Sequence, residues 1–368
     1  MWIFSIIYVL IIFTYISFRL HRETFIMSIQ QEATSMAKSF SIIFVILFTF
    51  LQQWLLEKFS PKTVFIFNLL FISVFLCIFP YLPSFNFPPT NLFYKLLNDI
   101  PTLFFYITSE LFATIVSSNF WIWFNSINKN KSSTTIIFAI SQLSVIAGSL
   151  FFMMNSSVIT MVGALYLAIA FCFLLPDGLY QKKEFQLSLT WIPIASFLCG
   201  LVAGLIDPLC KYFLRTFSPK NFLNVLLPLM WILQSLLIMI VGFSVKYSVF
   251  WILPLSLCLL TSVFLTNNLF ILTIITCITV LSFKVLKYSL YSPAKEQLLQ
   301  LICSSNITLF DSIMSRLGKN SIAITLSIIF QSGQNWSTFY STAVVIVLII
   351  GTIWFIISII MQRQLEKN

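Results

Sequence analysis

Charged residues are scarce in this chain. Only 9% of its 368 residues are Asp, Glu, Lys or Arg, whereas about a quarter of a soluble globular protein is charged. Hydrophobic residues make up 59% of the chain and aromatic residues 17%. Apolar runs long enough to cross a bilayer recur from one end of the sequence to the other. The scarcity of charge excludes a soluble domain, and the apolar runs predict a polytopic membrane protein in a lipid bilayer.

Residues for metal and redox chemistry are also few. The chain has one histidine, His21, and its seven cysteines show no CxxC or other ligand spacing. Most of these cysteines lie within apolar runs, where cysteine acts as a small hydrophobic residue. We therefore expect no metal site and no cofactor. The net charge of +10 does not indicate nucleic-acid binding, because the basic residues are scattered between apolar spans, as expected for the loops of a membrane protein.

The apolar runs predict an all-α fold of about twelve transmembrane helices. We place these spans at residues 1–18, 38–56, 62–82, 101–124, 134–154, 157–176, 187–207, 221–245, 248–266, 268–287, 306–332 and 338–362. Twelve spans in a chain of this length leave short loops and no room for a soluble domain.

Basic residues in the loops predict the orientation, since they favour the cytoplasmic side. With both termini inside, the inner loops hold twelve: Lys58, Lys62, Lys129, Lys131, Lys182, Lys183, Lys246, Lys284, Lys287, Lys295, Arg363 and Lys367. The outer side holds seven: Arg19, Arg22, Lys38, Lys95, Lys211, Arg215 and Lys220. This distribution favours cytoplasmic termini and, in a bacterium, the inner membrane.

Six of the seven outer charges follow the first and seventh spans. These two places are equivalent if the chain consists of two six-helix halves, separated at the polar segment 176–183. We therefore predict an N-terminal half of residues 1–183 and a C-terminal half of residues 184–368. This arrangement matches the six-plus-six layout of major-facilitator-like transporters.

Several charges fall within the predicted spans, where they are costly and usually functional. Glu110 lies nine residues after Pro101, which places it about 14 Å into a hydrocarbon core of about 30 Å. It is a candidate for a substrate cavity or for proton coupling, or else a protonated or paired structural group. Asp207 and Lys211 form an i, i+4 pair at the end of the seventh span, where Pro208 can break the helix.

Seven charges lie between Lys284 and Lys319. Asp311, Ser315, Arg316 and Lys319 share one arc of the eleventh predicted span, as the angle of about 100° per residue places them. Such an arc suits an anionic group such as phosphate. Alternatively, this helix starts near Asn320 and the charges lie in a cytoplasmic loop. The preceding charges at Lys284, Lys287, Lys295 and Glu296 belong either to the same site or to an ordinary positive inner loop.

The segment Lys287–Glu296 reads Lys-Tyr-Ser-Leu-Tyr-Ser-Pro-Ala-Lys-Glu. It resembles the Lys-Tyr-Ser-Leu-Phe-Asp-Pro-x-Lys-Glu stretch of the non-mitochondrial ATP/ADP translocase (nucleotide transporter) family of intracellular bacteria and plastids. That family then has an Asp followed by Ser-Arg-Leu-Gly-Lys, and here Asp311 precedes Ser315–Lys319. Looser matches are Ser109-Glu110-Leu111 with Phe120, Phe124 and Asn125 beyond it, the Asp207–Lys211 pair, and Arg22-Glu23-Thr24. The chain is a short and divergent example, with Phe25, Ser292 and Ile307 where the family has other residues.

The resemblance implies a secondary transporter that exchanges nucleotides, ATP against ADP, by alternating access of two halves around a midplane cavity. It implies a substrate site made of Arg22, Glu110, Asn125, Asp207, Lys211, Lys287, Lys295, Glu296, Asp311, Arg316 and Lys319. The cations of this site would meet the phosphates, and the acids Glu110, Asp207 and Asp311 would pair with these cations when the site is empty. Phe120, Trp121 or Tyr288 would stack on the base or pack in the core. No covalent bond changes during such transport, so we expect that the protein is not an enzyme. We also expect it to be a monomer.

Two other functions stay open at this point. The same fold could carry another organic anion or a proton-coupled solute, with Glu110 as the protonation site. A more distant alternative is a membrane-embedded lipid-linked glycosyltransferase, with Glu23 and Glu32 as candidate acids. Such enzymes generally need a substantial catalytic loop or domain, for which this chain has no room.

Overall fold

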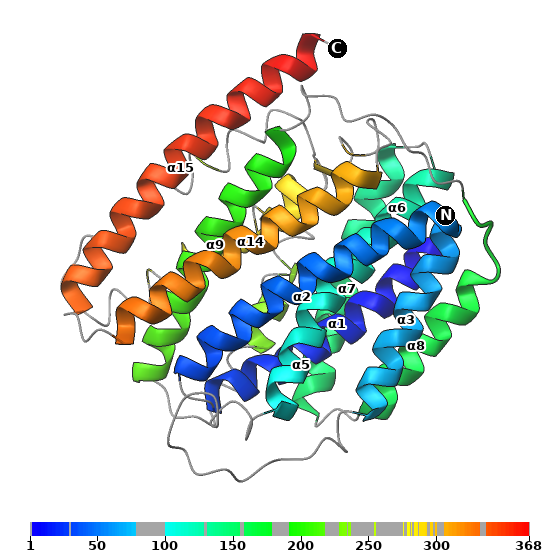
Figure 1. Cartoon of the computed structure of the whole chain (residues 1–368), viewed down its shortest axis with the longest axis horizontal. Coiled ribbons are helices and arrows are strands. Elements are labelled where there is room, and N and C mark those ends of the chain that lie inside the picture. The colour runs from blue at the N-terminus through cyan, green and yellow to red at the C-terminus, as the bar shows by residue number, and fades with distance from the viewer. Residues whose placement is uncertain are drawn as a thin grey trace. The chain divides into compact units, whose positions relative to one another are not determined.

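Apolar helices make up nearly all of the described part of the chain in the computed structural model (Figure 1). The structure describes residues 2–28, 31–78, 100–128, 131–154, 158–178, 191–217, 228–233, 235–236, 305–331 and 336–367, and between them residues 254, 275, 278–279, 281, 283–285, 287–292, 295–296 and 299. Within some helices only the backbone is described, notably at 23–28, 31–37, 100–102, 131–135, 207–217, 326–331, 336–344 and 361–367.

Two compact units divide the chain. The first consists of Met1–Lys183 with Cys303–Leu309, and the second of Glu184–Ile302 with Phe310–Asn368. We predicted six helices in each half. This number stays a prediction, because parts of both units lie outside the described residues.

The first unit is a bundle of long helices. These are α1 (Trp2–Ser28), α2 (Gln31–Lys58), α3 (Pro61–Ile78), α5 (Ile100–Leu111), η2 (Phe112–Val116), α6 (Ser117–Ile127), α7 (Lys131–Met153) and α8 (Val158–Cys172). The backbone stays in the right-handed helical region at Leu111 and Ser117, so α5, the π-helical turn η2 and α6 form one continuous helix. Helix α1 packs against α5, α7 and α8, while α3 packs against α6 and α8.

Aromatic and aliphatic side chains fill the centre of the first unit, with Phe65, Phe120, Trp123, Phe124 and Leu165 completely buried. Large apolar side chains also cover the outside, where Ile159 is 82% exposed and Met154 is 81% exposed. A surface of this kind is unfavourable in water and suits contact with lipid chains, since in hydrocarbon there is no penalty for exposing apolar groups.

The described helices of the second unit are α9 (Trp191–Phe217), the π-helical turn η4 (Lys287–Tyr291), α14 (Ser305–Gln331), whose first residues group with the first unit, and α15 (Trp336–Lys367). Helices α9 and α15 pack against each other. Close helix contacts also join α9 to α14. A Cβ atom on Gly200 or Gly204 of α9 would overlap the carbonyl oxygen of Ser315 or Lys319, and one on Gly318 would overlap that of Phe197.

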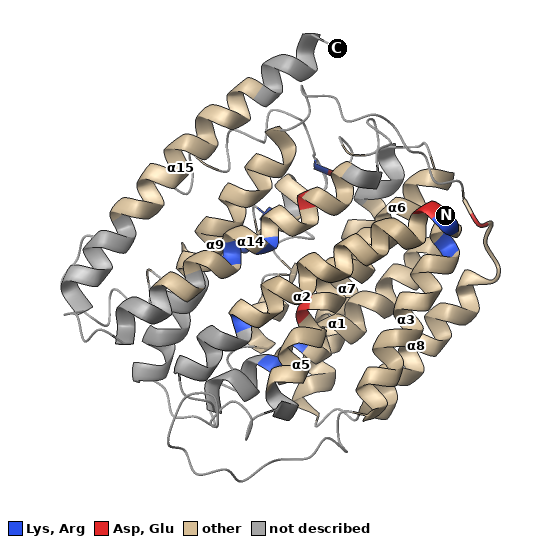
Figure 2. Ribbon diagram, viewed as in Figure 1, with Lys and Arg blue, Asp and Glu red and all other residues tan. Residues whose placement is uncertain are grey.

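Helices in the described part coincide with nine of the twelve predicted spans. Five of them are long and apolar enough to cross a membrane: Trp2–Arg22, Lys38–Lys58, Pro61–Ile78, Leu103–Ile127 and Ile136–Met153. Val158–Cys172, Trp191–Ile206 and Val345–Ile360 are shorter apolar helices. Most residues of the predicted spans 221–245, 248–266 and 268–287 lie outside the described residues. Figure 2 shows the charged residues separated by long uncharged stretches of helix.

Two boundary predictions were wrong. Helix α1 continues to Ser28, so Arg19 and Arg22 belong to a helix and are buried instead of lying in an outer loop. Helix α2 begins at Gln31, before the predicted start of its span at Lys38. Helix α9 runs without interruption through Pro208 to Phe217, so Pro208 does not break this helix.

Candidate functional site

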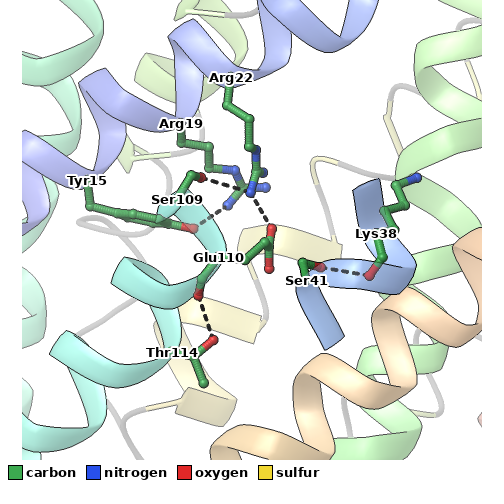
Figure 3. A network of polar contacts seen from close by, with 8 residues as sticks. All are labelled: Tyr15, Arg19, Arg22, Lys38, Ser41, Ser109, Glu110 and Thr114. Atoms are coloured by element: carbon green, nitrogen blue, oxygen red, sulfur yellow. Dashed lines mark hydrogen bonds and ion pairs between the residues drawn. The ribbon is translucent and has the colours of Figure 1, made fainter. Parts of the chain in front are cut away.

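A buried ion pair joins α1 to α5 in the first unit (Figure 3). Arg22 Nη1 contacts Glu110 Oε1 and also donates a hydrogen bond to Ser109 Oγ at 3.1 Å. The guanidinium carbon of Arg22 lies 5.2 Å from the centre of the Tyr106 ring. Both charged side chains are shielded from solvent. Each charge therefore depends on the other, because an unpaired charge in this position would cost several kcal/mol.

The backbone changes its helical register just after Glu110. The Thr114 hydroxyl donates to the Glu110 carbonyl oxygen at 2.8 Å, and the Ser118 hydroxyl donates to the Thr114 carbonyl at 2.5 Å. These bonds lie along the π-helical turn η2, which begins two residues after the carboxylate. Turns of this type are frequent at functional sites, because the extra residue changes where the next side chains point.

Other polar side chains surround this pair. Arg19 of α1 reaches the Tyr15 hydroxyl at 3.4 Å. On α2, the Ser41 hydroxyl donates to the Lys38 carbonyl at 2.7 Å. Figure 3 shows these residues from α1, α2 and α5 around the Arg22–Glu110 pair. We call Arg19, Arg22 and Glu110 the first cluster.

The second unit contains a lysine between two carboxylates. Lys295 Nζ lies 2.6 Å from Asp311 Oδ2 on α14 and 3.7 Å from Glu296 Oε1. Asp311 is only 1% exposed and Glu296 7% exposed. Each carboxylate has one buried oxygen, Glu296 Oε2 and Asp311 Oδ1, that lacks a hydrogen-bond partner. We call Lys295, Glu296 and Asp311 the second cluster.

Helices α9 and α15 enclose the neighbourhood of the second cluster. The Tyr291 hydroxyl, at the end of η4, lies 3.3 Å from Ser196 Oγ on α9. The Tyr291 ring packs edge-on against Trp354 of α15, with 5.6 Å between the ring centres. Cys199 of α9 is buried nearby. A π-helical turn therefore accompanies the buried acid–base group in each unit: η2 follows Glu110 and η4 precedes Lys295.

Glycines orient the charged helix α14. Because Gly200 and Gly204 lack side chains, the α9 backbone meets α14 at Ser315 and Lys319, and Gly318 makes the reciprocal contact with Phe197. Glycines spaced four residues apart allow this close approach in membrane helices. The contact holds α14 in one rotational position, with Asp311 facing Lys295 of the same unit.

The structure brings some of the predicted site residues together and separates others. Arg22 pairs with Glu110, and Lys295 with Glu296 and Asp311. Arg316 and Lys319 follow on α14, partly exposed. Lys287 is partly exposed, with its ammonium 5.4 Å from the centre of the Tyr288 ring. Asn125 lies at the end of α6, and its buried Oδ1 has no hydrogen-bond partner. The side chains of Asp207 and Lys211, like those of Glu23 and Glu32, lie outside the described residues.

Two alternatives from the sequence are wrong. Helix α14 begins at Ser305, not near Asn320, so Asp311, Arg316 and Lys319 all lie in a helix. The described residues between Lys287 and Glu296 are helical and not an open inner loop. Asp311, one member of the predicted polar arc, is buried against Lys295.

Phe120 and Trp121 pack in the core of the first unit. Phe120 stacks on Tyr8 with 4.6 Å between ring centres, and Trp121 stacks on Phe138 at 5.1 Å. Both side chains are buried, which places them in the hydrophobic core and leaves no exposed face for a base. Tyr288 remains partly exposed.

Three features of the site were not predicted. The glycines Gly200 and Gly204 form a G-x-x-x-G pattern that was readable in the sequence. The two π-helical turns have no comparable signal. A buried amide network also has no signal in the sequence. In this network Gln52 and Asn68 exchange two hydrogen bonds of 2.8 and 2.9 Å, and Asn119 donates to Gln52 at 2.9 Å. Among the described residues, no group of three His, Cys, Asp or Glu could hold a metal ion.

Comparison with known proteins identifies the fold. No family model and no curated protein matches the chain. A bacterial homologue of the iron transporter ferroportin, outward-facing with soaked iron, superposes with a TM-score of 0.68 at 12% identity, over 97% of this chain and 99% of that one. A second structure of a bacterial ferroportin homologue, also outward-facing, superposes with a TM-score of 0.67 at 11% sequence identity. The match covers 98% of this chain and 99% of that one. The major facilitator superfamily proton:xylose symporter XylE, bound to 6-bromo-6-deoxy-D-glucose, superposes with a TM-score of 0.65 at 10% sequence identity. The match covers 98% of this chain and 94% of that one. The predicted fold, an all-α, polytopic, major-facilitator-like membrane protein, is confirmed.

Proposed function

We propose that this protein is a secondary transporter of organic anions, with nucleotides as the first candidates and ATP/ADP exchange by alternating access as the mode. One observation carries the proposal. Each unit of the major-facilitator-like fold holds a cation against a buried carboxylate, Arg22 against Glu110 and Lys295 against Asp311. The proposal involves no chemical step on the solute, so it assigns no enzymatic activity.

A buried cation paired with a carboxylate is suited to exchange one anion for another. An isolated arginine or lysine within a membrane protein is costly, and its pairing lowers that cost. If an anionic solute reaches Arg22 or Lys295, a solute oxygen can take the place of the Glu110 or Asp311 carboxylate. The number of paired charges then stays the same. Such an exchange lets a solute bind without leaving a cation uncompensated.

Further cations favour a solute with several negative charges. Arg316 and Lys319 lie on α14 beyond Asp311, and Lys287 lies in η4. Arginine can bind a phosphate through two parallel hydrogen bonds, and lysine acts as a point charge. The resemblance of Lys287–Glu296 and Ser315–Lys319 to the nucleotide transporter motifs supports a nucleotide in particular.

A second candidate is another organic anion on the same fold. The structural neighbours are described as moving iron in one case and xylose in the other, so this fold does not by itself select a solute. The chain also lacks basic residues at Phe25 and Ile307, where the nucleotide transporter motifs have them. Fewer cations favour an anion of lower charge.

Uptake by intact bacterial cells tests the proposal. Cells that express the chain would be incubated with labelled ATP, ADP or another nucleotide, each alone and with an excess of unlabelled competitors. The Lys58→Gln variant, changed at an exposed lysine in the last turn of α2, serves as the matched control. We expect saturable uptake of at least one nucleotide in wild type and control. If no nucleotide enters or competes while another organic anion does, the second candidate replaces the first. If no anion enters cells that contain correctly inserted protein, the proposal is refuted.

A further inference from the structure

We infer that the second cluster is a proton site, in which Glu296 binds a proton in mildly acidic buffer and binds it more tightly when an anionic solute draws Lys295 away from Asp311, so that the proton moves with the solute. The inference rests on the proposed transport of anions and adds a coupling ion to it. It also moves the protonation site from Glu110, the candidate in the sequence, to a residue of the other unit.

The charges of the second cluster do not balance. It contains one ammonium, that of Lys295, and two buried carboxylates, those of Glu296 and Asp311. The titratable groups around it are Tyr291 and Lys287 of η4 and Cys199 of α9. The helix α14 contributes Asp311 and, further along, Arg316 and Lys319, and α15 contributes the Trp354 ring. One additional proton would balance the two carboxylates and the ammonium.

Lys295 is shared unequally between the two acids. Its ammonium lies 2.6 Å from Asp311 Oδ2 but 3.7 Å from Glu296 Oε1, so the hydrogen bond goes to Asp311. Glu296 Oε2 is buried and accepts no hydrogen bond. A buried acceptor without a donor is unfavourable, and more so when it is charged. A proton on Glu296 removes that charge and supplies a donor.

Glu110 lacks these properties. Its carboxylate contacts the guanidinium of Arg22 directly, and the same Arg22 nitrogen also bonds Ser109. Arginine keeps its charge in proteins, so this pair stays ionised on both sides. The geometry thus separates the two acids: Glu110 has a dedicated cation, whereas Glu296 competes with Asp311 for one lysine.

Solute and proton binding would favour each other in this cluster. When an anionic oxygen binds Lys295, Asp311 loses its cation and the two carboxylates are left close together without compensation. Two acids so placed share one proton readily, as like charges in one site do. By linkage, if the anion strengthens proton binding, the proton strengthens anion binding by the same factor.

Infrared spectroscopy tests proton binding without any solute. Purified full-length protein in lipid nanodiscs would be taken from mildly alkaline to mildly acidic buffer, and the carbonyl band of a protonated carboxylic acid recorded. We expect this band in wild type, its loss in Glu296→Gln, and a shifted titration midpoint in Asp311→Asn. The control Asp177→Asn, at a carboxylate that is 66% exposed, should keep the band and its midpoint. A band that persists unchanged in Glu296→Gln, or that is absent from folded wild type, overturns the inference.

Transport into vesicles tests the coupling. Empty proteoliposomes that enclose a pH dye would receive labelled ATP, with labelled ADP in parallel. We expect about one proton to enter with each solute molecule, and uptake without proton entry in Glu296→Gln. Solute uptake with no proton entry overturns the inference but leaves the proposed transport intact. Stimulation by sodium in place of protons also overturns it. If wild type takes up no solute into empty vesicles but exchanges it in vesicles preloaded with unlabelled ADP, the coupling is overturned and the proposed transport stands. If it does neither, the proposed function is refuted, whereas the infrared result still decides whether Glu296 binds a proton.

Discussion

Arg22 and Glu110 are 88 positions apart in the sequence, and their side chains form a buried ion pair between α1 and α5 (Figure 3). The pair lies next to the π-helical turn η2, where the helix that carries Glu110 changes register. The pair therefore links the Arg22 charge on α1 to the π-helical turn that follows α5. A solute that replaced either partner would act directly on the contact between these two helices.

The first prediction concerns this pair. Arg22→Gln and Glu110→Gln should each lower the free energy of unfolding by about 3–5 kcal/mol, because each leaves the other charge buried and uncompensated. The double variant should lose less than the sum of the two, since no unpaired charge remains. Thermal unfolding of the purified proteins in the same detergent measures all four species. Additive losses would show that the two residues do not stabilise each other.

The second prediction compares two lysines. Lys295→Gln should abolish solute uptake and destabilise the second unit, because Asp311 is buried and loses its hydrogen-bond donor. Lys62→Gln changes an ion pair of similar length, 2.9 Å to Asp177, whose carboxylate is 66% exposed. Exposed pairs contribute about 0–1 kcal/mol, so this control should retain uptake. Uptake and Tm are measured in parallel, and equal losses in both variants would contradict the functional assignment of Lys295.

The third prediction concerns the contact of α9 with α14. Gly200→Ala and Gly204→Ala place a methyl group on the backbone of Ser315 or Lys319 and should destabilise the protein by about 1–3 kcal/mol through overpacking. Gly163→Ala is the matched control, because no atom lies within 4 Å of its new Cβ. That substitution in α8 should be neutral or slightly stabilising, as alanine favours helix more than glycine. If all three alanines have the same Tm, the close contact does not exist.

The fourth prediction concerns the amide network of the first unit. Gln52→Leu removes both hydrogen bonds to Asn68 and the one from Asn119. Polar bonds between membrane helices contribute about 0.6–2 kcal/mol each, so a clear drop in Tm is expected. Gln53→Leu, at the adjacent and partly exposed position, provides the control and should leave Tm unchanged. If Gln52→Leu and Gln53→Leu have the same Tm, the amide network does not stabilise the first unit.

Much of the fold could be predicted from the apolar runs. Nine of the predicted spans coincide with described helices because a membrane helix must be long and apolar, and this requirement is local. Helix ends were less predictable. Arg19 and Arg22 look like loop residues in the sequence, but α1 continues through them because the Arg22 charge is compensated by Glu110 in a distant helix.

The candidate site could be predicted only in part. The positions of Asp311, Arg316 and Lys319 on one helix follow from helical periodicity. The partner of Asp311 does not, because Lys295 reaches it from a segment that contains a π-helical turn, and such turns shift the register without a signal in the sequence. The pairing within each cluster therefore required the structure.

If the solute moves by exchange on Arg22 and Lys295, the wild-type protein catalyses counterflow. Proteoliposomes would be loaded with unlabelled ADP and diluted into a trace of labelled ATP, with no ion gradient and no energy source. We predict a transient accumulation of label inside wild-type vesicles that is absent in Lys295→Gln and in Arg22→Gln. If wild-type vesicles, loaded in turn with nucleotides and with other organic anions, never accumulate label above its external concentration, exchange on these two cations is refuted.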